Sequence, residues 1–187
     1  VIKSADTVIR YSLENARFLL SKNIKLLVVA CYTASAVALP ALRERCSLPI
    51  IGVMEPGARK AIRSTRQKRV GVIGTERTIN SKAYLTSIKG IDRGIEVISQ
   101  ACPLFVPLVE EGWTDNDIAS LTAKRYLQTL KDANIDTLIL GCTHYPLLKG
   151  VIREVLGDEV IVVDSAEETA MVKKCVLKAD NSLRDGD

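Results

Sequence analysis

The amino-acid sequence predicts an α/β protein built from parallel sheets with helices on both faces. Short, continuously apolar runs such as "KLLVV" alternate along the chain with amphipathic segments of helical spacing. Such alternation is typical of parallel strands joined by right-handed helical crossovers. The composition agrees, because 47% of the 187 residues are hydrophobic and 26% are charged, as in a globular protein with a core to bury.

The first third of the chain contains helices and strands in alternation. They are a helix over residues 5–22, a strand over 24–30, a helix over 34–45, a strand over 48–53 and a helix over 55–65. The first helix carries an apolar stripe, and the first strand is apolar throughout, which predicts cover on both of its faces. Thr33 or Ser35 could cap the second helix, and Pro40 is expected to kink it.

The rest of the chain continues the same pattern. It predicts a strand over 68–74, a helix over 77–89, a strand over 95–99, a loop over 101–113, a helix over 114–133, a strand over 136–141, a helix over 145–157 and a strand over 159–164. The loop is predicted from its two prolines. Thr114 and Asp117 suggest a capping box for the helix that follows. The polar tail, residues 179–187, is predicted to be disordered.

Composition and charge argue against several classes of protein. The net charge is only +4, and the longest uncharged stretch, "LLVVACYTASAVALPAL", is too short and too polar for a membrane span. Six basic residues in "RKAIRSTRQKR" are interpreted as a solvated helix face. Aromatic residues are only 4% of the chain, which argues against nucleic-acid binding. Five cysteines without a CxxC pair, beside a single histidine, predict free thiols in a reducing cytoplasm and no metal site.

Two strand ends, "LLVVACYT" and "TLILGCTH", have nearly the same form: each has an apolar strand, a small residue, a cysteine and a threonine within the next two positions. In parallel sheets, ligands bind at the carboxyl ends of the strands. Cys31 and Cys142 could therefore face a substrate from two sides, and a helix start after each would favour the thiolate. The alternative is that each is a small buried core residue, as free cysteines often are.

Other residues at strand ends could assist these thiols. His144, the single histidine, follows Cys142 by two positions and could transfer a proton near neutral pH. One of the adjacent carboxylates Glu110 and Glu111 could orient it. Thr75 and Thr78 end another strand, where they either cap a helix or help to hold a carboxylate.

Five segments together resemble bacterial glutamate racemases, of the aspartate/glutamate racemase superfamily. They are "VVACYTASAVALPALRE", "GVMEPGARKA", "VGVIGTERTI", "ACPLFVPLVEEG" and "LILGCTHYPLLK", and the resemblance runs from about Leu13 to Ala170. It implies interconversion of L- and D-glutamate without a cofactor, supplying D-glutamate for peptidoglycan. One cysteine removes the α-proton as a thiolate, and the other returns a proton to the opposite face.

The resemblance also implies roles for individual residues. Cys31 and Cys142 are the two catalytic thiols, and His144 and Glu111 support the Cys142 side. The expected substrate-binding residues are Tyr32, Thr33, Thr75, Thr78, Thr143 and His144. No metal is implied.

The family architecture has two similar α/β domains with the active site between them. Here residues 1–54 and 164–187 would form an incomplete first domain, and residues 55–163 the second. A homodimer is also implied, because dimers are usual in the family.

The sequence departs from the family pattern in two ways. The family's first strand and its acidic loop do not occur in this sequence, which predicts an unpaired sheet edge or a poorly formed first domain. Tyr32 stands where the family has Asn, and it changes both volume and hydrogen bonding. Both departures predict little or no racemase activity for this chain alone.

Two further functions remain open from the sequence. One is racemisation of aspartate or another amino acid by the same chemistry. The other is a non-catalytic binding protein, for which the basic segment 59–69 would be the first region to test.

Overall fold

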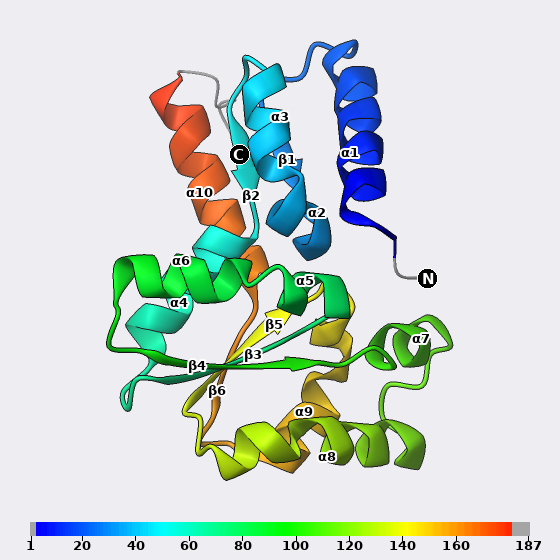
Figure 1. Cartoon of the computed structure of the whole chain (residues 1–187), viewed down its shortest axis with the longest axis vertical. Coiled ribbons are helices and arrows are strands. Elements are labelled where there is room, and N and C mark those ends of the chain that lie inside the picture. Colours follow the sequence, from blue (N-terminus) through cyan, green and yellow to red (C-terminus); the bar gives the residue numbers. More distant parts are fainter. Residues whose placement is uncertain (1–2, 181–187) are drawn as a thin grey trace.

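Two parallel sheets make up the core of the protein in a computed structural model, which describes residues 3–180. One sheet has two strands and the other has four, and helices flank both (Figure 1). The predicted α/β class is confirmed, and each predicted strand is present. The disorder predicted for the tail concerns residues 179–187, of which 181–187 lie outside the described part of the chain.

The two-stranded sheet belongs to the N-terminal part of the chain. Its elements are α1 (Ala5–Leu20), β1 (Leu27–Val29), α2 (Tyr32–Val37), α3 (Leu39–Arg45) and β2 (Ile50–Gly52). Strands β1 and β2 pair in parallel, with Leu27 opposite Ile50, and β1 has no second partner among residues 3–180. Val28 is 37% exposed, so the prediction that this strand is covered on both faces is wrong.

The four-stranded sheet has the order β4-β3-β5-β6, and every pairing is parallel. The elements that build it and cover it are α4 (Met54–Ser64), β3 (Arg69–Gly74), α5 (Glu76–Asn80), α6 (Ala83–Ile91), β4 (Glu96–Ala101), α7 (Phe105–Glu110), α8 (Asp117–Asp132), β5 (Thr137–Gly141), the 3-10 helix η1 (Tyr145–Leu148), α9 (Lys149–Leu156) and β6 (Ile161–Val163).

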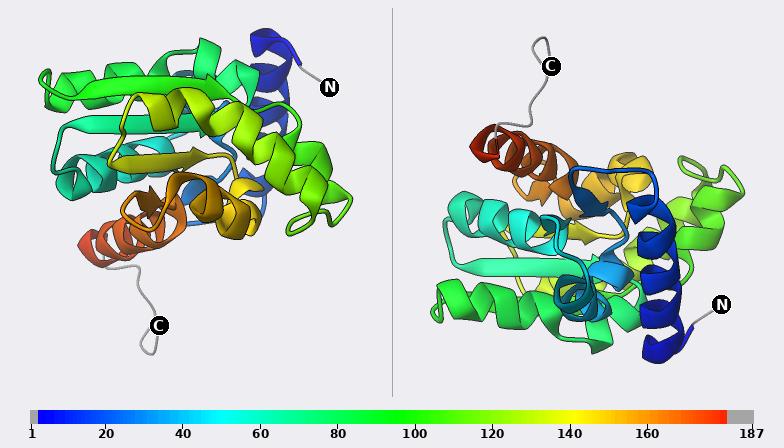
Figure 2. Two further views of the ribbon diagram at one scale, coloured as in Figure 1. Left: turned by 90° about the horizontal axis from the view of Figure 1, so that it is seen from below. Right: turned by 90° about the horizontal axis from the view of Figure 1, so that it is seen from above.

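Each face of the four-stranded sheet has its own apolar core. Helices α4 and α6 cover one face, and α8 and α9 cover the other (Figures 1 and 2). The first core contains Val70, Val72 and Ile139, and the second contains Ile73, Leu138 and Leu140. Strands buried on both faces explain why their sequences are apolar without alternation.

The last helix, α10 (Ser165–Ala179), leaves the four-stranded sheet and packs against α4 and β2. The Glu168 carboxylate accepts a hydrogen bond of 2.6 Å from Arg63 and lies 3.2 Å from the Lys60 ammonium, which ties α10 to α4. Helices α1 and α10 lie on opposite sides of the two-stranded sheet (Figures 1 and 2). The predicted domain limits are compatible with this path and stay a prediction.

The segment predicted as a loop from its prolines is partly helical, because α7 spans Phe105–Glu110. Pro107 is the third residue of α7. The first N–H groups of a helix have no partner within the helix, so a proline there removes no hydrogen bond. Pro107 is therefore compatible with α7, and the predicted loop is wrong for residues 105–110.

The helix predicted over residues 34–45 is two helices that meet at Ala38. Pro40 is the second residue of α3, so the predicted kink is a full break. The predicted caps are wrong, because Cys31 occupies the N-cap position of α2 and makes no side-chain cap hydrogen bond. The Ser35 hydroxyl instead donates to the Val29 carbonyl at 2.7 Å.

Two other predicted helices also differ from the structure. The segment 77–89 is divided into α5 and α6 by Lys82, whose φ of 55° lies in the left-handed region. Asn116, and not Thr114, caps α8 by accepting a hydrogen bond of 2.9 Å from the Ala119 N–H. An asparagine oxygen directly before the helix satisfies this N–H better than the more distant threonine.

Strands β3 and β5 approach each other closely where they end. A Cβ added to Gly141 would lie 2.5 Å from the Ile73 carbonyl oxygen, so only glycine fits this position. From β3 the chain passes to β4 on one side of β3, and from β4 it returns to β5 on the other side. The carboxyl ends of β3 and β5 therefore form the switch point at which parallel sheets bind ligands.

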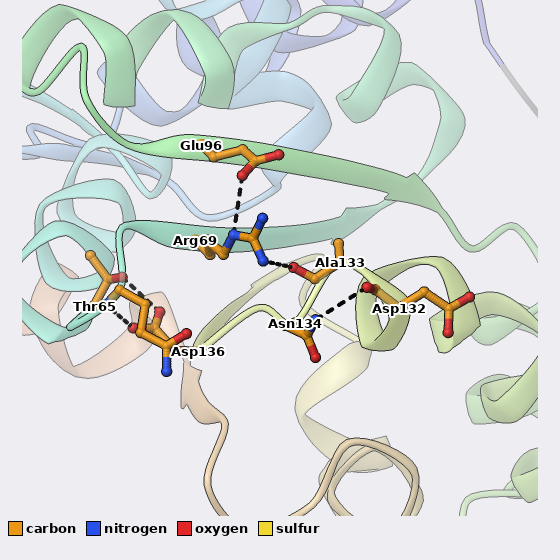
Figure 3. A network of polar contacts seen from close by, with 8 residues as sticks. Thr65, Arg69, Glu96, Asp132, Ala133, Asn134 and Asp136 are labelled. Carbon is orange, nitrogen blue, oxygen red and sulfur yellow. Dashed lines mark hydrogen bonds and ion pairs between the residues drawn. The ribbon is translucent and has the colours of Figure 1, made fainter.

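At the amino-terminal ends of the strands, a network of polar contacts holds the sheet (Figure 3). The Asp136 carboxylate accepts hydrogen bonds from the Thr65 hydroxyl and the Arg66 N–H, both at 2.6 Å, and from the Gln67 N–H at 2.5 Å. Partial burial raises the pKa of Asp136, but these hydrogen bonds outweigh it and bring the pKa below its ordinary value. The network joins the end of α4 to the start of β5.

Substituting Asp136→Asn is expected to lower the free energy of unfolding by about 1–2 kcal/mol at neutral pH, because an amide cannot accept all three hydrogen bonds. Because the pKa of Asp136 is lower in the folded state, its ionised carboxylate stabilises the fold above about pH 4. This contribution is lost as the pH falls through the folded-state pKa. Urea unfolding should therefore show a difference that shrinks in acid. The exposed Asp132→Asn keeps an oxygen that can accept the hydrogen bond from Gln128, so it is the control and should change little at either pH.

Candidate active site

The first candidate thiol, Cys31, lies two residues beyond the end of β1 and is exposed. It precedes α2 directly, so its position is set by the strand on one side and the helix on the other. The Ser35 hydroxyl fixes this turn, since it bonds the Val29 carbonyl and also accepts from the Val53 N–H at 3.3 Å. A single serine thus holds the ends of β1 and β2 together below the thiol.

The second candidate thiol, Cys142, follows β5 directly and is only 7% exposed. Burial raises the pKa of the Cys142 thiol, and negative charge on Cys31 raises it further. Hydrogen bonds from the backbone of His144 and Thr143 and from the Thr143 hydroxyl lower the pKa but do not compensate. Cys142 is therefore held as a thiol at neutral pH.

His144 lies between Cys142 and a carboxylate. Its Nδ1 is 3.7 Å from the Cys142 Sγ and 3.5 Å from the Thr143 Oγ1, and its Nε2 is 3.6 Å from the Glu110 Oε1. A proton can therefore pass along a line from carboxylate to imidazole to thiol when these contacts tighten around a substrate.

The carboxylate that faces His144 is Glu110, whereas Glu111 was predicted for this role. Glu110 is the last residue of α7, and Glu111 follows it at the C-cap position. Successive residues of a helix point about 100° apart, so only one of two adjacent carboxylates can face a given neighbour. The role predicted for Glu111 is corrected to Glu110 on this geometry.

Three threonine hydroxyls meet at the junction of the two sheets. The Thr33 Oγ1 is 3.1 Å from both the Thr75 and Thr78 hydroxyls, which are 3.0 Å from each other. Thr75 also caps α5 by accepting from the Thr78 N–H. Thr78 is 1% exposed, so it supports the other two from behind. Hydroxyls that can rotate toward a ligand are suitable donors for a carboxylate.

A cavity of about 470 Å³ opens beside Cys31. Its lining combines charged, hydroxyl and apolar side chains: Lys3, Val8, Cys31, Thr33, Thr75, Glu76, Arg77, Pro103, Val106, Pro107 and Glu110. Cys142 and His144 do not line it, although Glu110 connects it to them. Lys3 and Arg77 were missed by the sequence analysis, and the position of Arg77 between Thr75 and Thr78 was the available signal.

A larger cavity, of about 820 Å³, lies at the opposite edge of the four-stranded sheet and is lined by residues such as Arg66, Lys131 and Glu159. It contains no thiol or histidine. Because ligands of parallel sheets bind at the carboxyl ends of the strands, the smaller cavity is the candidate site.

The Tyr32 side chain does not line the cavity, although Tyr32 was expected to contact the substrate. It is 5% exposed and belongs to the apolar core that contains Met54, Ala58 and Tyr84. The structure therefore corrects this expectation for the side chain of Tyr32. Thr143, also expected to bind the substrate, is exposed beside His144.

The Asp/Glu/Hydantoin racemase family model matches residues 2–172. This chain belongs to that family. A glutamate racemase from Geobacter metallireducens is 61% identical over 97% of this chain and 67% of its own length. The family fold extends to solved structures, which agree closely with this chain.

A glutamate racemase isoform from Bacillus anthracis gives a TM-score of 0.94 at 43% identity, covering 98% of this family member and 69% of that chain. A glutamate racemase from Francisella tularensis, solved in complex with D-glutamate, gives a TM-score of 0.92 at 35% identity. The match covers 99% of this chain and 69% of that chain. This racemase-family chain thus spans about two thirds of the length of these relatives.

Alkylation of Cys142 is expected to require a pH above the ordinary thiol value of about 8.5, because burial and the charge of Cys31 both oppose its thiolate. Cys31→Ser should lower the midpoint of the alkylation profile by removing that charge. Peptide mass spectrometry after timed alkylation measures each cysteine separately. Cys175→Ser, at an exposed position on α10, is the control. An unchanged midpoint in Cys31→Ser would show that the two sulfurs do not share a site.

Proposed function

We propose that this site interconverts L- and D-glutamate by proton transfer between the α-carbon and two thiols. The observation that carries the proposal is the placement of the two strand-end cysteines: Cys31 lines the cavity together with Glu110, and Glu110 contacts His144 beside Cys142. The choice of glutamate rests on the relatives, which are glutamate racemases. D-Glutamate made in this way would supply peptidoglycan synthesis.

In this mechanism one sulfur acts as a thiolate and takes the α-proton, so that its S–H bond forms as the Cα–H bond breaks. The electron pair is delocalised into the α-carboxylate, and the other sulfur gives its proton to the opposite face of the α-carbon. The two sulfurs have then exchanged protonation states. Cys142 is suited to begin as the proton donor in one direction, because burial holds it as a thiol.

The hydroxyls of Thr33 and Thr75 are placed to bind the α-carboxylate, where negative charge builds up. Both lie at the cavity beside Cys31, and donors held in position before the reaction stabilise such charge most effectively. Thr78 keeps the pair in place. His144 and Glu110 then act on the Cys142 side by adjusting the proton on its sulfur.

Aspartate is the alternative substrate, and the relatives favour glutamate over it. The contacts of the basic segment 59–69 argue against a non-catalytic binding role for it, because most of its charges are already paired. Five of its six basic side chains lie against carboxylates: Arg59 on Glu55, Lys60 and Arg63 on Glu168, Lys68 on Asp92 and Arg69 on Glu96.

Other expectations from the sequence stay predictions: the cytoplasmic location, the homodimer and the low activity of this chain alone. No helix within residues 3–180 is long and apolar enough to cross a membrane.

Incubation with L-glutamate in D₂O should give D-glutamate that carries deuterium at the α-carbon. Cys31→Ala and Cys142→Ala should each reduce this rate by at least about 10²-fold, because each removes a group that exchanges the proton. Circular dichroism measures the loss of optical rotation, and proton NMR measures the exchange. Cys46→Ala, outside the site, should keep the parent rate. Exchange that survives in both single mutants would overturn the proposal, whereas a slow parent rate would agree with the low activity predicted for this chain alone.

Glu110→Gln is expected to lower kcat by about tenfold or more, because it removes the carboxylate that orients His144. Glu111→Gln changes the adjacent residue and should leave kcat near the parent value. The rates of L-to-D and D-to-L conversion should be compared. The larger loss is expected in the direction in which proton transfer at the Cys142 sulfur comes first. Equal losses in the two variants would contradict the assignment to Glu110.

A further inference from the structure

The cavity beside Cys31 has charged side chains that take part in no ion pair. Its lining includes four charged residues: Lys3, Glu76, Arg77 and Glu110. The Lys3 ammonium lies 5.1 Å from the centroid of the Tyr11 ring, and the Glu110 carboxylate faces the His144 imidazole. No ion pair or cation–π contact is recorded for Glu76 or Arg77 within residues 3–180. Their charges are therefore the ones that a ligand in this cavity could balance.

The hydrogen bonds of the Arg77 guanidinium are incomplete. Arg77 is half-buried, and its Nη2 donates a hydrogen bond of 3.1 Å to the Lys3 carbonyl. Its Nε is buried and has no acceptor in the described part of the chain. A guanidinium carries five N–H donors, and donors that are removed from water without an acceptor are costly. A carboxylate at this position would supply both the missing acceptor and the missing negative charge.

Arg77 is held close in the chain to the hydroxyls that are proposed to bind the α-carboxylate. It lies in the turn between Thr75 and Thr78, which is fixed because the Thr78 N–H donates to the Thr75 Oγ1 at 3.3 Å. Thr33, Thr75 and Arg77 line the same cavity. Hydroxyls are neutral donors, whereas a guanidinium is always charged and binds carboxylates through a planar fork. The cavity thus offers two different groups that can bind a carboxylate.

We propose that Arg77 binds the side-chain carboxylate of the substrate and makes this site selective for dicarboxylic amino acids. The assignment rests on the proposed function and names the residue that recognises the second carboxylate. With Thr33 and Thr75 on the α-carboxylate and Arg77 on the side chain, the substrate is bound at both ends. A neutral side chain would leave the guanidinium without a counter-charge, so it would bind more weakly.

Protection of Cys31 from alkylation measures occupancy of the cavity without turnover, because Cys31 is exposed and lines the cavity. The rate of its reaction with iodoacetamide is followed by peptide mass spectrometry as L-glutamate is added. L-Glutamine is the neutral amino acid of the same length. In the parent chain, half-protection by L-glutamate should need a concentration at least about tenfold lower than half-protection by L-glutamine, since charge-assisted hydrogen bonds are the stronger ones.

Arg77→Gln should raise the L-glutamate concentration for half-protection by about tenfold or more, because it removes the charged fork. The value for L-glutamine should change by less than about twofold. Arg77→Lys keeps the charge without the fork and should fall between the parent and Arg77→Gln. The matched control is Arg93→Gln, the same change at an exposed arginine between α6 and β4, and it should protect like the parent.

A second comparison separates a direct contact from the overall charge of the cavity. Lys3→Gln removes the other cation of the lining and keeps the backbone carbonyl that Arg77 contacts. It should raise the L-glutamate concentration for half-protection by less than Arg77→Gln does. An equal rise in the two variants would overturn the role of Arg77, since it would show that only the summed charge matters.

The remaining outcomes separate this inference from the proposed reaction. If neither amino acid protects Cys31 in the parent chain, the cavity does not hold the substrate, and the proposed function falls together with this inference. If both protect the parent equally well, the role of Arg77 alone is overturned, and this result needs no variant that folds. Equal losses for L-glutamate and L-glutamine in Arg77→Gln would also overturn that role, by showing that Arg77 shapes the cavity and does not recognise the carboxylate.

Discussion

The close approach of β3 and β5 at their carboxyl ends is the constraint on which the site depends. Gly141 permits it, since any side chain there would meet the Ile73 carbonyl oxygen. Because the two strands end side by side, Thr75 and Cys142 leave the sheet at the same edge. The pairing of the two backbones therefore sets the positions of the Thr75 hydroxyl and the Cys142 thiol.

The first thiol reaches this edge from a different sheet, and the contrast in burial follows from that. Cys31 belongs to a short strand that pairs with a single neighbour among the described residues, and it is exposed. Cys142 ends a strand buried in the middle of four. One sulfur is therefore accessible to solvent and the other is held in its protonated form, although each follows an apolar strand and a small residue.

The strands and their terminal cysteines were predictable because continuous apolar runs depend on local sequence and on burial from both faces. The orientation of side chains was not. Glu110 and Glu111 could be told apart only once residues 105–110 were known to be helical. The prolines of this segment instead predicted a loop. The burial of Tyr32 depends on packing against residues such as Ala58 and Tyr84, which are distant in sequence and carry no signal that pairs them with Tyr32.

The threonine triangle has a consequence for the stability of the junction between the two sheets. Thr33 belongs to the part of the chain around the two-stranded sheet, whereas Thr75 and Thr78 belong to the four-stranded one. A carboxylate bound by Thr33 and Thr75 together would contact both parts of the chain at once. Because a ligand stabilises the arrangement that it binds, such an acid would strengthen the junction as well as occupy the cavity.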